Sequence, residues 1–218
     1  MPNGGSQRSA PSPTGSRGHL ALVVFDAMGV LYSAADDVAD VLIPYLRRLG
    51  SPRADAEIEE FYQRASLGAL TSAQLWAACG VPADDDAYCS GHRLQPRIDA
   101  LLDDLRRRDV PLACLSNDVS EWSALLRRRF GLDRSVGTWV ISGDIRARKP
   151  APEAFEALAH ATGVPLNQMV FFDDRTANVG AARALGMDAV EFASVPQARE
   201  ALRARGLLPP TRSTARPV

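Results

Sequence analysis

Acidic side chains with the potential for catalysis stand at the ends of short apolar runs in this sequence. Asp26 follows one such run, and the pair Asp173 and Asp174 follows another. Lys149 is the single lysine among 25 basic residues. Carboxylates held close together repel unless a cation lies among them, and a lysine can pair with both a carboxylate and a phosphoryl oxygen. We therefore expect these four residues to share one site.

The elements that must position these residues alternate along the chain. Short buried strands are expected at 20–25, 112–115, 139–142, 169–172 and 189–192, and helices at 97–108, 120–130, 152–162, 177–185 and 194–206. Strands that alternate with helices of this length predict an α/β fold with a doubly wound, Rossmann-like parallel sheet. Ligands of such sheets bind beyond the carboxyl ends of the strands, where Asp26, Ser116 and Asp173 all lie.

The segment between the first two predicted strands has a helical pattern only. Amphipathic helices are expected at 36–49, 54–67 and 71–80. A helical insertion at this point of a parallel sheet would lie over the carboxyl edge of the strands. We therefore predict an all-helical cap.

These patterns divide the chain into four parts. They are a disordered tail (1–18), an α/β core (19–32 and 93–206), the helical cap (33–92) and a flexible tail (207–218). The first tail is rich in Pro, Gly and Ser and lacks the apolar stretch of a secretory signal.

Composition excludes several classes of function. The formal net charge is −1 at pH 7, and no apolar run approaches the length of a membrane span, so we expect neither nucleic acid nor a membrane as partner. The three cysteines are odd in number and irregularly spaced, which argues against a disulfide framework or a cysteine-based metal site. A reduced, cytoplasmic setting and a small-molecule substrate are therefore expected.

The predicted set of groups suits phosphoryl chemistry. Hard oxygen ligands with few neighbours suit Mg²⁺, which binds through one or two carboxylates plus substrate phosphate. Ser116 and nearby backbone N–H groups can hold phosphoryl oxygens. Asp26 can then serve as the nucleophile and form an aspartyl intermediate.

Four segments, in this order, resemble the motifs of the haloacid dehalogenase-like hydrolases: VVFDAMGVLY, LACLSND, RARKPAPEAF and FFDDRTANVGAARALGM. The resemblance covers about residues 20–205. It implies this family's Rossmann-like core, with the helical segment as the smaller type of cap between the first two motifs.

The resemblance also implies roles for individual residues. Asp26 would be the nucleophile, Ser116 would bind the transferred group, and Lys149 would orient and neutralise the phosphoryl oxygens. Asn117 is a second candidate for substrate contact. The metal ligands would be Asp26, the backbone carbonyl of Met28, and Asp174, with Asp173 beside them.

Met28 departs from the phosphatase version of the first motif. That version has a second aspartate at this position, which protonates the leaving oxygen and then activates water. Met28 has no proton to give, and general acid–base catalysis is typically worth ~10²–10⁴-fold. Alkyl phosphate esters should therefore be poor substrates.

Three interpretations remain open. The substrate is a phosphorylated compound whose leaving group needs little protonation or supplies its own proton; or the enzyme displaces halide at carbon, as the dehalogenase branch of the family does; or the chain has lost catalysis and only binds. The pair Asp173 and Asp174 favours the first, because displacement at carbon needs no metal. We expect a Mg²⁺-dependent hydrolase of phosphatase type.

Overall fold

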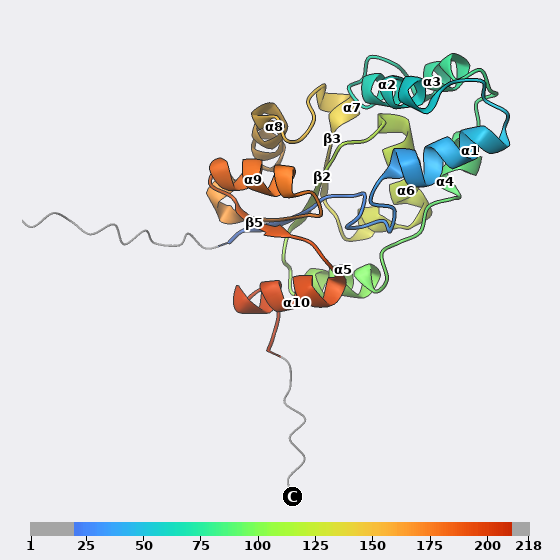
Figure 1. Ribbon diagram of the computed structural model, residues 1–218. Helices are drawn as coiled ribbons and strands as arrows, with labels where there is room; N and C mark the ends of the chain where they lie inside the picture. The colour runs from blue at the N-terminus through green and yellow to red at the C-terminus, as the bar shows by residue number, and fades with distance from the viewer. Residues whose placement is uncertain (1–19, 211–218) are drawn as a thin grey trace, which may run out of the picture.

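The computed structural model describes residues 20–210 of the 218-residue chain (Figure 1). The predicted tail 1–18, and the part of the predicted tail 207–218 that begins at residue 211, lie outside the described residues.

Five strands form one sheet in which all neighbouring strands are parallel. They are β1 (Leu22–Phe25), β2 (Leu112–Ser116), β3 (Thr138–Ile141), β4 (Met169–Asp173) and β5 (Asp188–Glu191), in the spatial order β3-β2-β1-β4-β5. Phe25 at the end of β1 lies opposite Cys114 of β2 and Phe172 of β4. The polar residues that follow these positions therefore come to the same edge of the sheet, as the sequence predicts.

Apolar residues fill both faces of the sheet. Successive side chains of a strand point to opposite faces, so Val23 and Phe25 of β1 pack into one core, whereas Leu22 and Val24 pack into a second. Every residue of β1, β2 and β4 is buried. This explains why these strands appear in the sequence as continuous apolar runs.

Helices cover both faces, as in a doubly wound fold (Figure 1). One core receives side chains from α5 (Ile98–Arg106), α6 (Ser120–Arg129) and α10 (Val195–Ala204); the other receives them from α8 (Pro152–Thr162) and α9 (Thr176–Ala184). The predicted fold class is confirmed.

The segment between β1 and β2 contains helices and, among the described residues, none of the sheet strands. These helices are η1 (Val38–Leu42), α1 (Ile43–Arg48), α2 (Asp55–Ala65), α3 (Ser72–Ala78) and α4 (Asp85–Cys89). The predicted start of α3 is confirmed, because the Thr71 hydroxyl accepts from the Gln74 backbone N–H and the Gln74 side chain accepts from the Thr71 N–H. The boundaries of the cap at 33 and 92 remain a prediction.

The expected helix over residues 36–49 is present as one continuous helical run. Its first part, Val38–Leu42, is π-helical, and the α-helix Ile43–Arg48 follows without a break, since Leu42 and Ile43 both have helical backbone angles. Pro44 cannot donate the N–H that an α-helix needs at this position, and the π-helical part lies directly before it. The predicted helix is therefore confirmed, with a local change of helix type before the proline.

Four short elements were not predicted. They are α4, the four-residue α7 (Ser142–Ile145), and the 3₁₀ turns η2 (Leu132–Arg134) and η3 (Leu166–Gln168). Elements this short do not complete the periodic pattern on which the sequence argument depends. Ser142 consequently begins a helix, and the expected strand 139–142 ends one residue earlier.

Hydrogen bonds hold the helical segment against the core beside the carboxyl edge of the sheet. Asp85 of α4 accepts from the indole N–H groups of Trp76 and of Trp122, both at 2.6 Å. Ser142 donates to the carbonyl of Ser66 at 2.5 Å. Trp122 and Ser142 belong to the core, so these contacts fix the helices over one side of the predicted site.

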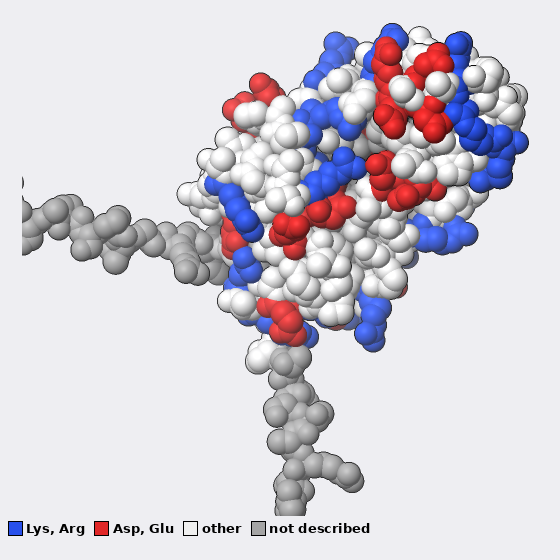
Figure 2. Space-filling model, viewed as in Figure 1, with Lys and Arg blue, Asp and Glu red and all other residues white. Residues whose placement is uncertain are grey.

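The surface, the helices and the cysteines concern the partners and sites that the composition argues against, namely nucleic acid, membranes, disulfides and cysteine-based metal sites. Acidic and basic side chains alternate over the face in Figure 2, which carries no broad basic area in the part of the chain that the structure describes. No helix among these residues is both long and apolar enough to cross a membrane. Cys79, Cys89 and Cys114 are buried and free. The cytoplasmic setting stays a prediction.

Candidate active site

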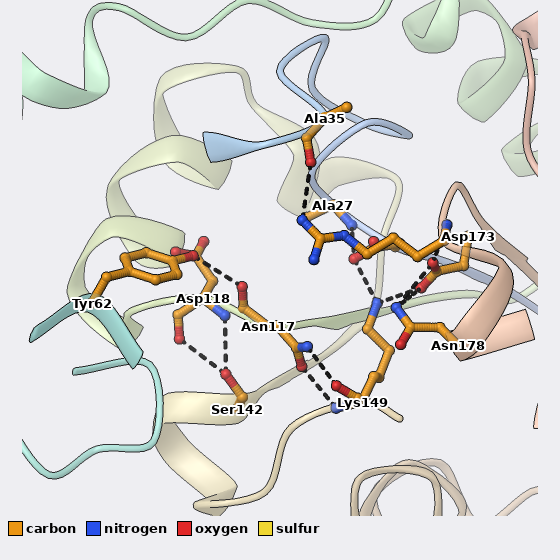
Figure 3. A network of polar contacts seen from close by, with 11 residues as sticks. Ala27, Ala35, Tyr62, Asn117, Asp118, Ser142, Lys149, Asp173 and Asn178 are labelled. Carbon is orange, nitrogen blue, oxygen red and sulfur yellow. Dashed lines mark hydrogen bonds and ion pairs between the residues drawn. The ribbon is translucent and has the colours of Figure 1, made fainter. Parts of the chain in front are cut away.

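A buried ammonium joins two carboxylates at the carboxyl edge of the sheet (Figure 3). Lys149 Nζ lies 2.6 Å from Asp26 Oδ1 and 2.7 Å from Asp173 Oδ2. Asp26 follows β1, Asp173 ends β4, and Lys149 comes from the loop between α7 and α8. The structure thus brings together three predicted site residues that are far apart in the sequence.

Further hydrogen bonds orient the two carboxylates. The Ala27 N–H donates to Asp26 Oδ1 at 2.6 Å. Asp173 accepts from the Arg175 N–H at 2.8 Å, and the Asn178 side chain donates to both of its oxygens at 3.0 Å. Since both oxygens of Asp173 already have donors, this carboxylate is suited to hold its neighbours in place.

Burial makes the charges of this network interdependent. Burial raises the pKa of Asp26 to about 7; Lys149 offsets only part of the effect, and Asp173 adds to it. Burial alone would lower the pKa of Lys149, but the carboxylates of Asp26 and Asp173 outweigh it and raise this pKa above its usual value. The lysine therefore stays cationic.

Three carboxylates could hold a cation. Asp26, Asp173 and Asp174 each offer an oxygen, and these atoms lie within 4.8 Å of one another. Asp174 Oδ1 is buried and has no hydrogen-bond partner among the described residues. Burial, with the neighbouring charge of Asp173, raises the pKa of Asp174. A partnerless buried oxygen beside other carboxylates fits a hard divalent cation such as Mg²⁺.

Gly29 makes room for the third carboxylate. Its φ is +77°, and a Cβ at this position would collide with the carboxylate of Asp174. Only glycine combines the left-handed backbone with so close an approach. The first and fourth motifs are thereby brought into contact at the candidate metal site.

The two residues at the end of β2 differ in their surroundings. Ser116 is buried, and its hydroxyl has no hydrogen-bond partner among the described residues. The side chain of Asn117 forms two hydrogen bonds of 2.9 Å with the backbone of Lys149, donating to its carbonyl and accepting from its N–H. The amide thus fixes the loop that carries the lysine, and its contact with substrate stays a prediction.

A small pocket of about 40 Å³ opens beside the carboxylates. Met28 is buried and belongs to its wall, as do Asp26 and Lys149. The remaining lining residues are Ala35, Asp36, Asp37, Val38, Tyr62, Asn117, Arg148, Arg175 and Asn178. The thioether of Met28 thus occupies the part of the pocket wall where the phosphatase version of the first motif has an aspartate.

Several of these residues were not predicted as part of the site. Asn178 lies outside the predicted set of site residues, and its amide holds Asp173 by hydrogen bonds within the fourth motif. Arg148 directly precedes Lys149, and Arg175 directly follows Asp174. This adjacency to predicted site residues is the one feature of the sequence that points to their place on the pocket wall. Tyr62 comes from α2, where its spacing predicts a packing residue.

A family model described as haloacid dehalogenase-like hydrolase matches residues 20–186. The chain belongs to the haloacid dehalogenase-like hydrolases. The predicted family and the prediction of a hydrolase are thereby confirmed.

Individual members of the haloacid dehalogenase-like hydrolases are similar over most of the chain. A phosphoglycolate phosphatase of Pseudomonas putida is 28% identical over 185 residues, which cover 78% of this chain and 68% of that protein. A family enzyme of Bacteroides thetaiotaomicron, solved as a magnesium complex, superposes with a TM-score of 0.70 at 18% identity, covering 84% and 98% of the two chains. An L-2-haloacid dehalogenase of Xanthobacter autotrophicus superposes with a TM-score of 0.56 at 20% identity, covering 84% and 82%. At these sequence identities the superpositions show a similar fold and nothing further.

Proposed function

We propose that this chain is a Mg²⁺-dependent phosphatase that acts on a small phosphorylated metabolite through Asp26. The observation that carries the proposal is the buried series of charges Asp26–Lys149–Asp173, with the partnerless oxygen of Asp174 beside it. The phosphatase relatives support reaction at phosphorus. As part of this proposal, residues 33–92 act as the cap that excludes bulk water from the core.

In the proposed reaction a carboxylate oxygen of Asp26 attacks phosphorus, and the bond from phosphorus to the leaving oxygen breaks. Lys149 holds the attacking carboxylate in place and neutralises charge on the phosphoryl oxygens. The free hydroxyl of Ser116 donates to one of these oxygens. Water then attacks phosphorus, the bond from phosphorus to the Asp26 oxygen breaks, and the proton of the water leaves with the released inorganic phosphate, which restores the Asp26 carboxylate.

The Mg²⁺ site of this proposal uses oxygen atoms of the first and fourth motifs. Asp26, Asp174 and the backbone carbonyl of Met28 would hold the ion, with Asp173 beside them. When bound, Mg²⁺ supplies positive charge at the phosphoryl oxygens. Asp173 is already engaged by Lys149 and Asn178. In this arrangement Asp173 therefore holds its neighbours in place beside the ion.

Met28 limits which phosphorylated compounds can react. Its side chain cannot protonate a departing alkoxide, and an alkoxide without a proton is a poor leaving group. An acyl phosphate releases a carboxylate, which needs little protonation. The proposed substrates are therefore compounds with such a leaving group, or compounds that supply the proton themselves.

The same residue favours one alternative, displacement of halide at carbon by Asp26. Halide leaves without a proton, so Met28 would be no handicap. The pair Asp173 and Asp174 argues against this alternative, since such displacement needs no metal. A chain that has lost catalysis and only binds is the remaining alternative.

A small substrate screen separates these functions. Acetyl phosphate, ethyl phosphate and 2-chloropropionate are each incubated with the protein in Mg²⁺ and in EDTA, and release of phosphate or chloride is measured. We expect phosphate release from acetyl phosphate that EDTA abolishes, and much slower release from ethyl phosphate.

Other results of the screen would contradict the proposal. Chloride release that EDTA does not affect would establish the carbon-acting alternative. Absence of turnover with every compound, together with equal phosphate binding by the parent and by Asp26→Asn, would establish the binding protein.

A further inference from the structure

Three cations line the small pocket, and only one of them forms ion pairs with protein carboxylates. Lys149 pairs with two carboxylates. Arg148 and Arg175 also line the pocket, and neither forms an ion pair with any acid among the described residues. Two guanidinium groups at one small cavity, both without a counter-ion, form a site for an anion.

Arg148 is held in place by the helical segment. Its guanidinium lies 5.8 Å from the ring centroid of Tyr62 and donates to the hydroxyl of Ser66. Burial lowers the pKa of Arg148, but a guanidinium stays charged throughout the physiological range. These contacts leave other N–H donors of the fork available, and they reduce the entropy lost when an anion binds.

Arg175 approaches the pocket from the fourth motif. Its guanidinium donates to the carbonyl of Ala35 at 3.4 Å (Figure 3). This contact carries the side chain from the start of α9 to the loop that follows Met28. Its charge lowers the pKa of Arg148, after burial, which agrees with the two guanidinium groups lying near one another.

The acids on the pocket wall are engaged elsewhere. Asp37 accepts hydrogen bonds of 2.6 Å from Tyr88 and from His92. Asp36 accepts from the backbone N–H of Ala39 at 3.1 Å. The charges of Asp118 and Asp26 act on Arg148, and that of Arg175 acts on Asp174, but neither arginine forms an ion pair with an acid among the described residues.

We propose that Arg148 and Arg175 bind a carboxylate of the substrate beside the phosphoryl site, so that the substrate is a small phosphorylated carboxylic acid. This inference rests on the proposed function. A planar carboxylate matches the fork of a guanidinium, and both arginines line the same pocket as Lys149, which suits a substrate whose two anionic groups lie close together. The phosphoryl group alone would leave the two arginines uncompensated.

Two phosphonates of the same shape test the inference. Phosphonoacetate carries a carboxylate, and carbamoylmethylphosphonate carries a neutral amide in its place. Binding of each to the full chain is measured by calorimetry in saturating Mg²⁺. We expect phosphonoacetate to bind roughly tenfold more tightly, as a charge-assisted pair provides.

Two variants test whether the arginines cause the tighter binding of phosphonoacetate. Arg148→Gln and Arg175→Gln should each bring the two Kd values together without weakening the binding of the amide. Arg64→Gln, at an exposed arginine of α2, is the matched control and should keep the parent's preference. Should Arg148→Gln fail to fold in a thermal denaturation assay, the exposed Arg175 provides the same test.

The outcomes distinguish this inference from the proposed function. Equal affinity of the parent for both phosphonates overturns the carboxylate subsite and leaves phosphoryl binding intact. A preference that survives in both arginine variants overturns the assignment to these residues. Binding of neither phosphonate overturns the proposed function, and the subsite with it.

Discussion

The two sides of the pocket differ in how completely they are equipped for phosphoryl transfer. On the side of the sheet, Asp26, Lys149 and Asp173 form a continuous buried network, and each of the three has a partner in the others or in the backbone. On the side of the loop after β1, Met28 offers no ionisable group. The first side holds charge in place before substrate arrives; the second has no proton to give at the position of Met28.

This difference separates two parts of catalysis that usually occur together. Preorganised charges stabilise the transferred group whatever its leaving group is. The rate gained from general acid catalysis increases with the basicity of the leaving group, because a more basic group must be protonated before it departs. We therefore expect the leaving group, rather than the phosphoryl group, to decide which substrates react.

The largest effect should come from breaking the charged side. Asp26→Asn keeps the shape of the side chain but removes the nucleophile, so kcat for acetyl phosphate should fall by roughly 10⁴-fold or more. Release of inorganic phosphate measures this. Glu59→Gln, at an exposed residue of α2, should leave kcat unchanged. A kcat for Asp26→Asn close to that of the parent would exclude the nucleophilic role.

The next largest effect should come from equipping the other side. Met28→Asp should raise kcat/KM for ethyl phosphate by ~10²-fold, because it supplies the missing acid, and should change kcat/KM for acetyl phosphate much less, since this quantity reports the step in which the leaving group departs. Met28→Asn introduces a side chain of the same size as aspartate but without the carboxyl group, and it serves as the control. An equal gain in Met28→Asn would show that space, and not proton transfer, limits the parent.

A smaller effect concerns the pH dependence of stability in EDTA. The pKa of Asp26 is about 7 in the folded protein, above its ordinary value of 3.8, so the folded state binds more protons than the unfolded state between these values. The free energy of unfolding should therefore fall as pH rises from 3.8 to about 7 and level off above that, with the folding equilibrium constant decreasing by at most about tenfold per pH unit.

Urea unfolding of the parent and of Asp26→Asn at pH 5 and pH 8 measures this contribution. The parent should lose more stability than the variant over this interval, and Mg²⁺ should reduce the difference because a cation favours the ionised carboxylate. Equal losses in both proteins would mean that Asp26 does not titrate in this range.

The smallest effect should come from loosening the loop that carries Lys149. Asn117→Ala removes two hydrogen bonds to the backbone of this lysine, so the free energy of unfolding should fall by about 1–2 kcal/mol and kcat by a few-fold. Urea unfolding and phosphate release give both values, and the exposed Asn167→Ala is the control. An unchanged kcat would indicate that this loop keeps its position without the amide.

The sequence by itself determined the sheet and the residues at its edge. Apolar runs of four or five residues mark β1, β2 and β4, because strands buried on both faces have no polar side to show. The carboxyl ends of parallel strands must meet, so Asp26 and Asp173 were predictable as neighbours. The helix Pro152–Thr162 has the predicted bounds, because proline begins it and Gly163 follows it.

The tertiary structure alone decided the walls and the charges of the pocket. Arg148 and Arg175 acquire a role only because α2 and the loop after β1 reach them, and no local pattern encodes such a contact. The raised pKa of Asp26 depends on its burial, and the close approach of the Asp174 carboxylate to the first motif depends on the absence of a Cβ at Gly29. Local periodicity fixes where an element lies, whereas the environment of a side chain is the sum of contacts from the whole chain.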